Sequence, residues 1–303
     1  MQSSTREGRV SRNNYDISLN KDVMKTILKN KYIKRLASLN DQFCFFQFNR
    51  KELDKRLLEF GPNAGDLFTT DLFASNDMAP RIRVKISKLP SFQNLNQTFT
   101  FGAYFSTSYE VVSYYLIDSL ELLKSINSST FIATNDTQLE EKYNLTLESS
   151  SIPIIDISLI NTLKYLRLRR NHFTHLYEEI GNPLKSLICD FGSDLNRYWE
   201  GSLSQLDFES YNVLKFDEQE TIDMLKLLKI IIEKLDSNLA PHLNHEGIAE
   251  YLVKKEYSDS EQRKNLDLVN KRTQKIITLS STHFSTPIDR TIIEQKVNEF
   301  GWK

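Results

Sequence analysis

Apolar residues recur at helical spacing over most of this chain, and few residues interrupt the pattern. Over residues 106–126 they form two stripes, which predicts a long helix buried on two sides. A second long helix is predicted from about residue 154, where apolar positions alternate between four and three residues apart. The seam of this second helix consists of Leu159, Leu163, Leu166, Arg170, Phe173, Tyr177 and Ile180. Arg170 alone in this seam is neither apolar nor aromatic.

Shorter helices are predicted before and after this pair. Residues 22–39 and 50–60 form two of them, and Gly61-Pro62 stops the second. Gly181-Asn182-Pro183 ends the second long helix and opens a short one that reaches Phe191. The C-terminal part contains four more, at residues 220–235, 246–255, 258–278 and 287–300. The last two begin with helix-start signals, a capping box at Ser258-x-x-Glu261 and a cap followed by proline at Thr286-Pro287.

Two segments depart from the helical pattern. Basic and apolar side chains alternate over residues 81–87, and this period of two predicts a half-exposed strand, for which residues 98–101 are the candidate partner. Residues 127–151 are polar and acidic, and they form a connection between the two long helices. A helical turn can form within this connection at residues 138–143.

These patterns predict a mainly α fold in four parts. Residues 1–20 form a flexible tail, and residues 21–100 an N-terminal accessory region in which short strands can occur. Residues 101–240 form a helical bundle, and residues 241–303 a C-terminal helical extension. Glycine and proline number only 9 and 7 among 303 residues, too few for the frequent tight turns of Greek-key and barrel proteins.

Charge and cysteine content narrow the classes of partner. The 39 basic and 40 acidic residues give a net charge of −1, so the whole chain has no electrostatic preference for nucleic acid or membranes. The first twenty residues lack the apolar segment of a secretion signal, and no run is long enough to span a membrane. Cys44 and Cys189 stand in apolar surroundings, which predicts buried free thiols. We therefore expect a cytoplasmic protein without a membrane partner.

A cluster of chemically active side chains surrounds Arg170 in the string RLRRNHFTH, residues 167–175. Burying an unpaired guanidinium costs several kcal/mol, so a chain that keeps one in an apolar seam pairs it or uses it. Asn171 and His175 are four residues apart and share a helix face, while Arg170 can border the same groove. A groove where a guanidinium meets an imidazole suits a phosphodiester, because arginine binds phosphate and histidine transfers protons near neutral pH.

Arg170-Asn171-x-x-x-His175 resembles the R-x4-6-H motif of HEPN-domain ribonucleases, in which a polar residue, commonly asparagine, often follows the arginine. The order of a long apolar helix, a motif helix and a short helix, from Ser106 to about Phe191, is similar too. With the next helix counted, the resemblance covers roughly residues 101–240. The resemblance implies an all-α bundle whose sites join across a homodimer interface into one metal-independent centre that cleaves RNA. It also implies a toxin or an antiviral-defence effector, controlled by a regulatory protein partner or antitoxin.

On this hypothesis, the 2′-hydroxyl of RNA attacks the adjacent phosphate and leaves a 2′,3′-cyclic phosphate and a 5′-hydroxyl. His175 acts as general acid or base, Arg170 stabilises the charge on the phosphorane, and Asn171 orients the arginine or the phosphate. Arg167-x4-His172 is a second match to the motif, although Arg167 lies off the seam. The supporting candidates are His172, Arg169, Arg167, Glu110 and Asp118, the last two as positioning groups from the preceding helix.

The even overall charge is an average over unlike parts. No acidic residue occurs between Asp156 and Glu178. That stretch holds the cations Lys164, Arg167, Arg169 and Arg170. This local excess can act on phosphate although the whole protein is not basic.

An alternative interpretation stays open. In it, Arg170 forms a structural ion pair with a carboxylate such as Glu110 or Asp118, and the protein is a non-catalytic helical scaffold or a module that binds protein or RNA. His242-x-x-His245-Glu246 has the residue types of a metal site, but it straddles a helix start, which favours capping. The chain lacks glycine-rich phosphate loops and C-x-x-C pairs, so we expect neither a cofactor nor a metal.

Overall fold

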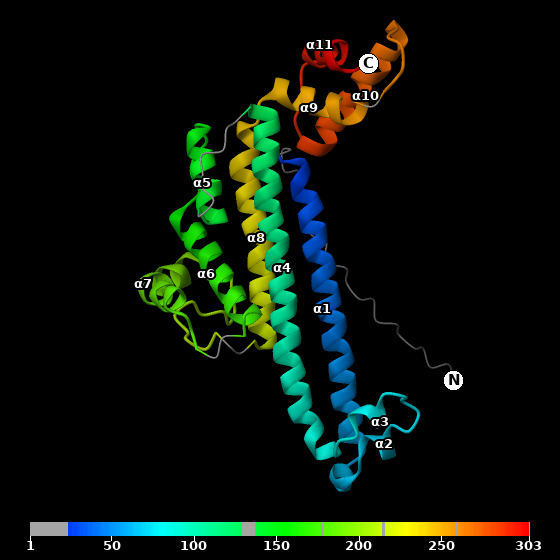
Figure 1. Ribbon diagram of the computed structural model, residues 1–303, viewed down its shortest axis with the longest axis vertical. Helices are drawn as coiled ribbons and strands as arrows, with labels where there is room; N and C mark the ends of the chain where they lie inside the picture. Colours follow the sequence, from blue (N-terminus) through cyan, green and yellow to red (C-terminus); the bar gives the residue numbers. More distant parts are fainter. Residues whose placement is uncertain (1–23, 129–136, 177–178, 214–215, 259, 303) are drawn as a thin grey trace, which may run out of the picture.

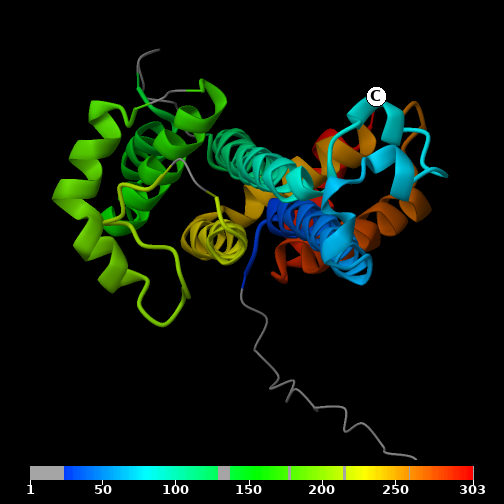
Figure 2. The same cartoon turned by 90° about the horizontal axis from the view of Figure 1, so that it is seen from below.

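The computed structural model describes residues 24–128, 137–176, 179–213, 216–258 and 260–302, and this part of the chain is all-α. Three long helices form its centre, α1 (Ile27–Glu59), α4 (Leu89–Asn127) and α8 (Glu218–Leu239). Figure 1 shows them side by side along the length of the molecule, and Figure 2 shows them as neighbours from below. α4 also contacts smaller helices, so it is the central helix of the fold.

Local sequence signals explain where the long helices begin and end. Thr26 precedes α1, and its hydroxyl accepts a hydrogen bond from the Leu28 N–H at 3.2 Å. After α1 the chain turns at Gly61, whose φ of 74° is a conformation that glycine adopts with little strain. Asp217 caps α8, because its carboxylate accepts from the Glu220 N–H at 2.7 Å.

Three further helices cover one side of the α4–α8 pair. α5 (Leu139–Ser149) and α6 (Ile157–Thr174) pack against α4, and α7 (Asn182–Tyr198) packs against α6. In Figure 2 the green helices of this group lie on one side of α4 and α8, and the blue α1 lies on the other. The C-terminal end of α6 is thereby placed beside α4, away from α1.

The two ends of the long helices carry different small elements (Figure 1). At one end α9 (His245–Tyr257), α10 (Leu266–Phe284) and α11 (Arg290–Phe300) pack together, and α9 contacts α4. The other end holds α2 (Thr69–Leu72), α3 (Ala79–Ile82) and the 3₁₀ turns Pro62–Asp66 and Ile86–Lys88. A third 3₁₀ turn, Ala240–His242, directly follows α8.

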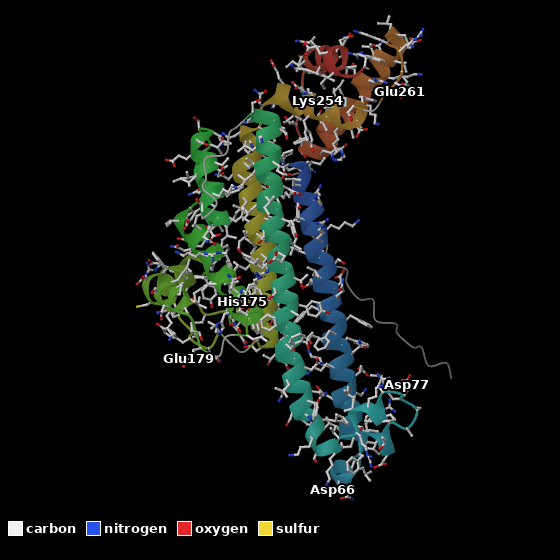
Figure 3. All side chains as sticks on the ribbon, viewed as in Figure 1. Asp66, Asp77, His175, Glu179, Lys254 and Glu261 are labelled. Carbon is white, nitrogen blue, oxygen red and sulfur yellow. The ribbon has the colours of Figure 1, made fainter. Side chains whose placement is uncertain are left out.

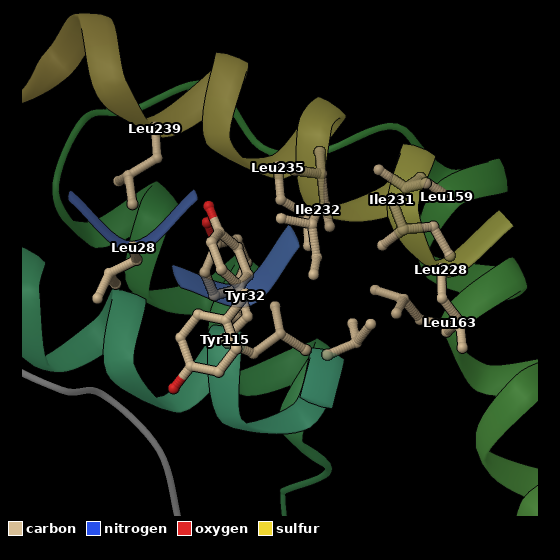
Figure 4. Packing of buried hydrophobic residues seen from close by; sticks show 14 of the residues in the cluster. Leu28, Tyr32, Tyr115, Leu159, Leu163, Leu228, Ile231, Ile232, Leu235 and Leu239 are labelled. Atoms are coloured by element: carbon tan, nitrogen blue, oxygen red, sulfur yellow. The ribbon is translucent and has the colours of Figure 1, made fainter. Parts of the chain in front are cut away.

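The hydrophobic core lies where α1, α4, α6 and α8 meet. Figure 4 labels its members Leu28, Tyr32, Tyr115, Leu159, Leu163, Leu228, Ile231, Ile232, Leu235 and Leu239. The rings of Tyr32 and Tyr115 meet edge to face with their centroids 5.7 Å apart. Asp236 is also buried there, and burial raises the pKa of its carboxyl, although hydrogen bonds from Thr26 and Tyr115 oppose the shift.

The two predicted strands are wrong. Residues 81–87 span the end of α3 and part of a 3₁₀ turn, and residues 98–101 lie inside α4. Within the ranges given above, the one β-type contact is an isolated bridge between Phe68 and Lys85. Residues 98–101 are helical because the helix buries Phe101 against α1, where the ring centroids of Phe101 and Phe43 lie 5.1 Å apart. An isolated two-stranded ribbon, by contrast, is only marginally stable in water.

Some predicted helices are confirmed and others have wrong boundaries. The helices at residues 106–126, 220–235 and 246–255 lie within α4, α8 and α9. Residues 22–39 and 50–60 were assigned to separate helices, but residues 27–59 form the single helix α1, because neither glycine nor proline interrupts them. α10 begins after the cap Asn265 rather than at Ser258, and α11 begins after the cap Asp289 rather than at Pro287 after the predicted cap Thr286.

The structure also bears on the four predicted parts. The boundary between residues 100 and 101 falls within α4, and α1 packs against both α4 and α8. The described residues 24–100 therefore share a core with the helices that follow. The tail at residues 1–20 and the seam position Tyr177 lie outside the described residues.

The prediction that both thiols are buried is wrong. Cys44 and Cys189 are free but exposed. Apolar neighbours in sequence do not show that a helix residue is buried, because adjacent residues of a helix face different directions. Phe43 is buried, for example, while Phe45 is 65% exposed. Across the described part of the chain, no helix combines the length and apolar character needed to cross a bilayer.

Candidate functional site

The motif residues lie at the C-terminal end of α6. This helix starts at the cap Asp156, whose carboxylate accepts from the Ser158 N–H at 2.7 Å. It ends at Thr174, so His175 is the residue that closes it, and the His175 N–H donates to the Asn171 carbonyl at 3.0 Å. Leu176 then turns the chain with a φ of 52°. His175 is exposed at this turn, and Figure 3 shows it near the lower end of α6.

Phe173 holds this end of α6 against the central helix. Its ring lies over Gly102 of α4, where an added Cβ would approach the ring to 2.3 Å. The ring centroid of Phe173 is also 6.1 Å from that of Phe99 and 5.5 Å from that of Phe216. Gly102 is therefore a position of close approach, and it fixes the distance between the motif and α4.

Arg170 faces α4 and is only partly buried. Its guanidinium forms an ion pair with Glu110, and its Nη1 donates to Asn171 Oδ1 at 2.9 Å. The side chain of Arg170 is 29% exposed and that of Glu110 is 40% exposed, so solvent reaches the pair. The motif residues Arg170 and Asn171 thus form one connected polar group with Glu110 of α4.

Arg169 is the deeply buried arginine of α6. Its side chain is 1% exposed, and its Nη1 lies 2.6 Å from Glu220 Oε1 of α8. It also donates to the Tyr165 hydroxyl at 3.4 Å, and its guanidinium carbon lies 5.0 Å from the ring centroid of Phe216. This residue therefore ties α6 to α8, and its charge is compensated inside the core.

The remaining supporting candidates lie in other contacts. Arg167 Nε donates to Glu140 Oε1 of α5 at 2.9 Å. Asp118 contacts Lys31 at 2.7 Å and accepts from the Tyr32 hydroxyl, so it joins α4 to α1 and does not reach the motif. Arg167, Arg169 and Arg170 each pair with a carboxylate from a different helix, so their local positive charge is largely balanced.

A groove opens beside the motif, between the end of α6 and the start of α7. Its volume is about 320 Å³, and its lining residues are Leu168, Asn171, His172, His175, Gly181, Pro183 and Leu184. The structure thus brings Asn171, His172 and His175 to one surface, while Arg170 reaches this surface through Asn171. Burial, followed by the charge of Arg169, lowers the pKa of His172, so this imidazole is neutral at neutral pH.

Sequence reasoning missed the α7 side of this groove. Gly181 and Pro183 stood out only as the end of one helix and the start of the next, and Leu184 only as an apolar helix position. A signal existed, because a tight connection after a helix that carries a motif brings the next helix start close to it. The pairing of Arg169 with Glu220 had no signal, since 51 residues separate them.

The histidines near residue 242 lie in other contacts. His245 Nε2 lies 3.3 Å from Thr286 Oγ1, and the Glu246 N–H donates to the cap Asn244. No group of three or more histidine, cysteine, aspartate or glutamate side chains suited to a metal occurs in the described ranges.

Fold and site together define an all-α protein with a polar cluster and a small groove where α6, α4 and α7 meet. A scan of protein-family models, a search of curated proteins and a search of solved structures each find no match to this chain.

Proposed function

We propose that this protein is a metal-independent endoribonuclease of the HEPN type. The observation that carries the proposal is the position of the motif. Arg170 is hydrogen-bonded to Asn171, and Asn171 and His175 line one groove at a solvent-exposed helix end. A phosphate at this groove meets the amide of Asn171 and the imidazole of His175, and Asn171 connects them to the guanidinium of Arg170. An imidazole for proton transfer and a guanidinium for charge stabilisation are groups that favour phosphodiester cleavage.

The chemistry is an attack of the ribose 2′-oxygen on the adjacent phosphorus. His175 removes the 2′-hydroxyl proton, the bond from the 2′-oxygen to phosphorus forms, and the bond from phosphorus to the 5′-oxygen breaks. The leaving 5′-oxygen takes up a proton from solvent water, and the products are a 2′,3′-cyclic phosphate and a 5′-hydroxyl. Arg170 stabilises the negative charge on the phosphorane, while Glu110 and Asn171 hold the guanidinium in place.

The proposed active form is a homodimer in which two such motifs face each other. Support comes from an exposed apolar row on α4 next to the motif. Phe92, Leu95 and Phe99 are 50%, 73% and 63% exposed, and Phe99 contacts Phe173 of the motif helix. Exposed apolar rows of this kind commonly become buried in protein interfaces. By analogy with the family, the role is that of a toxin or an antiviral-defence effector restrained by a protein partner.

The test is RNA cleavage by the purified protein in buffer containing EDTA. His175→Ala removes the general base and Arg170→Ala removes the group that stabilises the phosphorane charge, so each is expected to lower the cleavage rate about a hundredfold or more. Arg263→Ala and His242→Ala, exposed residues far along the chain, serve as matched controls and should cleave like the wild type. Undiminished cleavage by His175→Ala would overturn the residue assignment, and cleavage that depends on added metal would overturn the mechanism.

A second candidate function is a helical scaffold without catalysis. It is favoured by the three ion pairs that link α6 to α4, α5 and α8 through Arg170, Arg167 and Arg169. Expression in a bacterial host separates the two functions. Growth arrest by the wild type that both Arg170→Ala and His175→Ala relieve supports the nuclease, whereas equal growth with all three proteins supports the scaffold.

A further inference from the structure

The groove beside His175 is lined by apolar side chains in one part and by polar side chains in another. Leu168, Pro183 and Leu184 make part of it apolar. Asn171, His172 and His175 bring amide and imidazole groups to the rest. Gly181 contributes no side chain, so the start of α7 leaves room in the groove. The volume of about 320 Å³ lies at the small end of ligand pockets, which suits a single flat ring system.

An unpaired nucleobase fits this lining. Proteins that bind single-stranded RNA take a splayed base by covering its apolar faces and by hydrogen-bonding its edge. Here the aliphatic side chains can cover a face, and Asn171 offers both a donor and an acceptor to the edge. His172 adds one donor and one acceptor as long as its ring is neutral. Burial and the nearby charge of Arg169 lower the pKa of His172 and so favour the neutral ring.

We propose that this groove is the binding site for the base next to the scissile phosphate, with His172 and Asn171 as the residues that select it. The inference rests on the proposed nuclease function, because Asn171 and His175 border both the base and the phosphate. It extends that function by naming the substrate class as single-stranded RNA with a base turned out of its stack. His172 is a specificity residue here and takes no part in the proton transfers.

Gly181 offers a way to fill the groove without disturbing the fold. Its φ of −65° and ψ of 148° are open to any residue, and an added Cβ would have its nearest neighbour, the Pro183 Cδ, at 3.8 Å. Gly181→Leu therefore adds side-chain atoms at a residue that lines the groove, without a clash of its Cβ and without a strained φ. Gly65→Leu is the matched control, because a Cβ there has its nearest neighbour at 3.7 Å and the site lies beyond the far end of α1. Leu168→Ala is a second variant, which removes an apolar wall.

The first experiment measures binding without cleavage. The probe is a single-stranded RNA oligonucleotide with methylated 2′-hydroxyls and one fluorescent 2-aminopurine in place of adenine. Wild type and Gly65→Leu should change the emission of 2-aminopurine on binding, while Gly181→Leu and Leu168→Ala should weaken that binding about tenfold. Equal binding by all four folded proteins, checked by their melting temperatures, overturns the base site. This result does not depend on whether the protein cleaves RNA.

The second experiment measures cleavage of matched RNAs that differ only in the base before the cut. Gly181→Leu should raise KM about tenfold for the purine substrate and less for the pyrimidine, with kcat nearly unchanged. A loss of kcat with an unchanged KM would contradict a role in base binding. If the wild type binds the probe but cleaves no RNA, the nuclease proposal fails while the base site stands, so the two failures are distinguishable.

Discussion

Arg169 and Arg170 are neighbours in sequence but have opposite surroundings. The sequence pattern placed Arg170 in the apolar seam, yet the structure buries Arg169 and leaves Arg170 29% exposed. The sequence pattern continues the seam through Tyr177 and Ile180, whereas α6 ends at Thr174. Over this shorter helix the natural period of 3.6 residues turns Arg169 inward, with Leu166 and His172 three residues away on either side.

Replacing the two arginines should have very different effects on stability. Arg169→Ala leaves Glu220 in a largely buried position without its cation, and we expect a loss of about 3–5 kcal/mol in the free energy of unfolding. Arg170→Ala breaks a partly exposed pair and should cost about 1 kcal/mol or less. Urea denaturation followed by circular dichroism measures both. Equal losses would show that the burial of Arg169 does not govern its contribution.

His172 should make the stability depend on pH. Its pKa is lowered in the folded state by burial and by Arg169, so the unfolded chain takes up the proton first as the pH falls. The free energy of unfolding therefore decreases as the pH falls below about 6.5, the pKa of histidine in the unfolded chain. His172→Gln should therefore gain stability relative to the wild type between pH 7 and pH 5, by at most about 1.4 kcal/mol per pH unit. Parallel stability curves, measured by urea denaturation, would contradict this.

At the scale of elements, the sequence predicts helices well where their apolar stripes are long. The bounds of α8 and α9 agree closely with their predicted ranges, because an apolar face at helical spacing runs along each of them. The sequence does not predict the first part of α4. This helix includes residues 98–101 because Phe101 packs against Phe43 of α1, a residue far from it in sequence. It likewise locates the motif on α6 but not the groove, since the groove needs the start of α7.

The contact between Gly102 and Phe173 couples α4 to the end of α6. Gly102→Ala places a Cβ within 2.3 Å of the Phe173 ring, so the ring and the last turn of α6 must shift. We expect a loss of about 1–3 kcal/mol from this overpacking. Adding Phe173→Ala removes the clash, so the double variant should lose less than the sum of the two single losses. A thermal unfolding cycle over the four proteins measures the coupling, and strict additivity would contradict the contact.

At the scale of the whole molecule, each chain carries the sequence Arg170-Asn171-x-x-x-His175 once. Arg170 turns toward Glu110 and His175 lies at the groove. In the proposed homodimer, a second copy supplies the second Arg170 and the second His175. The apolar row Phe92, Leu95 and Phe99 lies on α4, Phe99 contacts Phe173 of α6, and all three side chains are exposed among the residues that the structure describes. In a two-fold interface formed by this row, the row of each copy would be buried against the other copy. The two motifs would then lie close together.

Association and activity should therefore fall together on dilution. If the active centre is composite, cleavage per milligram of protein is constant while the dimer persists and drops below its dissociation constant. Leu95→Glu puts a charge into the proposed interface and should move both the dissociation, followed by sedimentation, and the loss of activity to higher protein concentration.

Leu58→Glu is the control for this experiment, because Leu58 is 82% exposed near the end of α1 and lies outside the row on α4. It should leave both transitions unchanged, since a charge there stays in water whether or not two copies meet. A wild type that remains monomeric while its activity per milligram stays constant would remove the composite site. The chemistry would then have to be carried by the single Arg170, Asn171 and His175 of one chain.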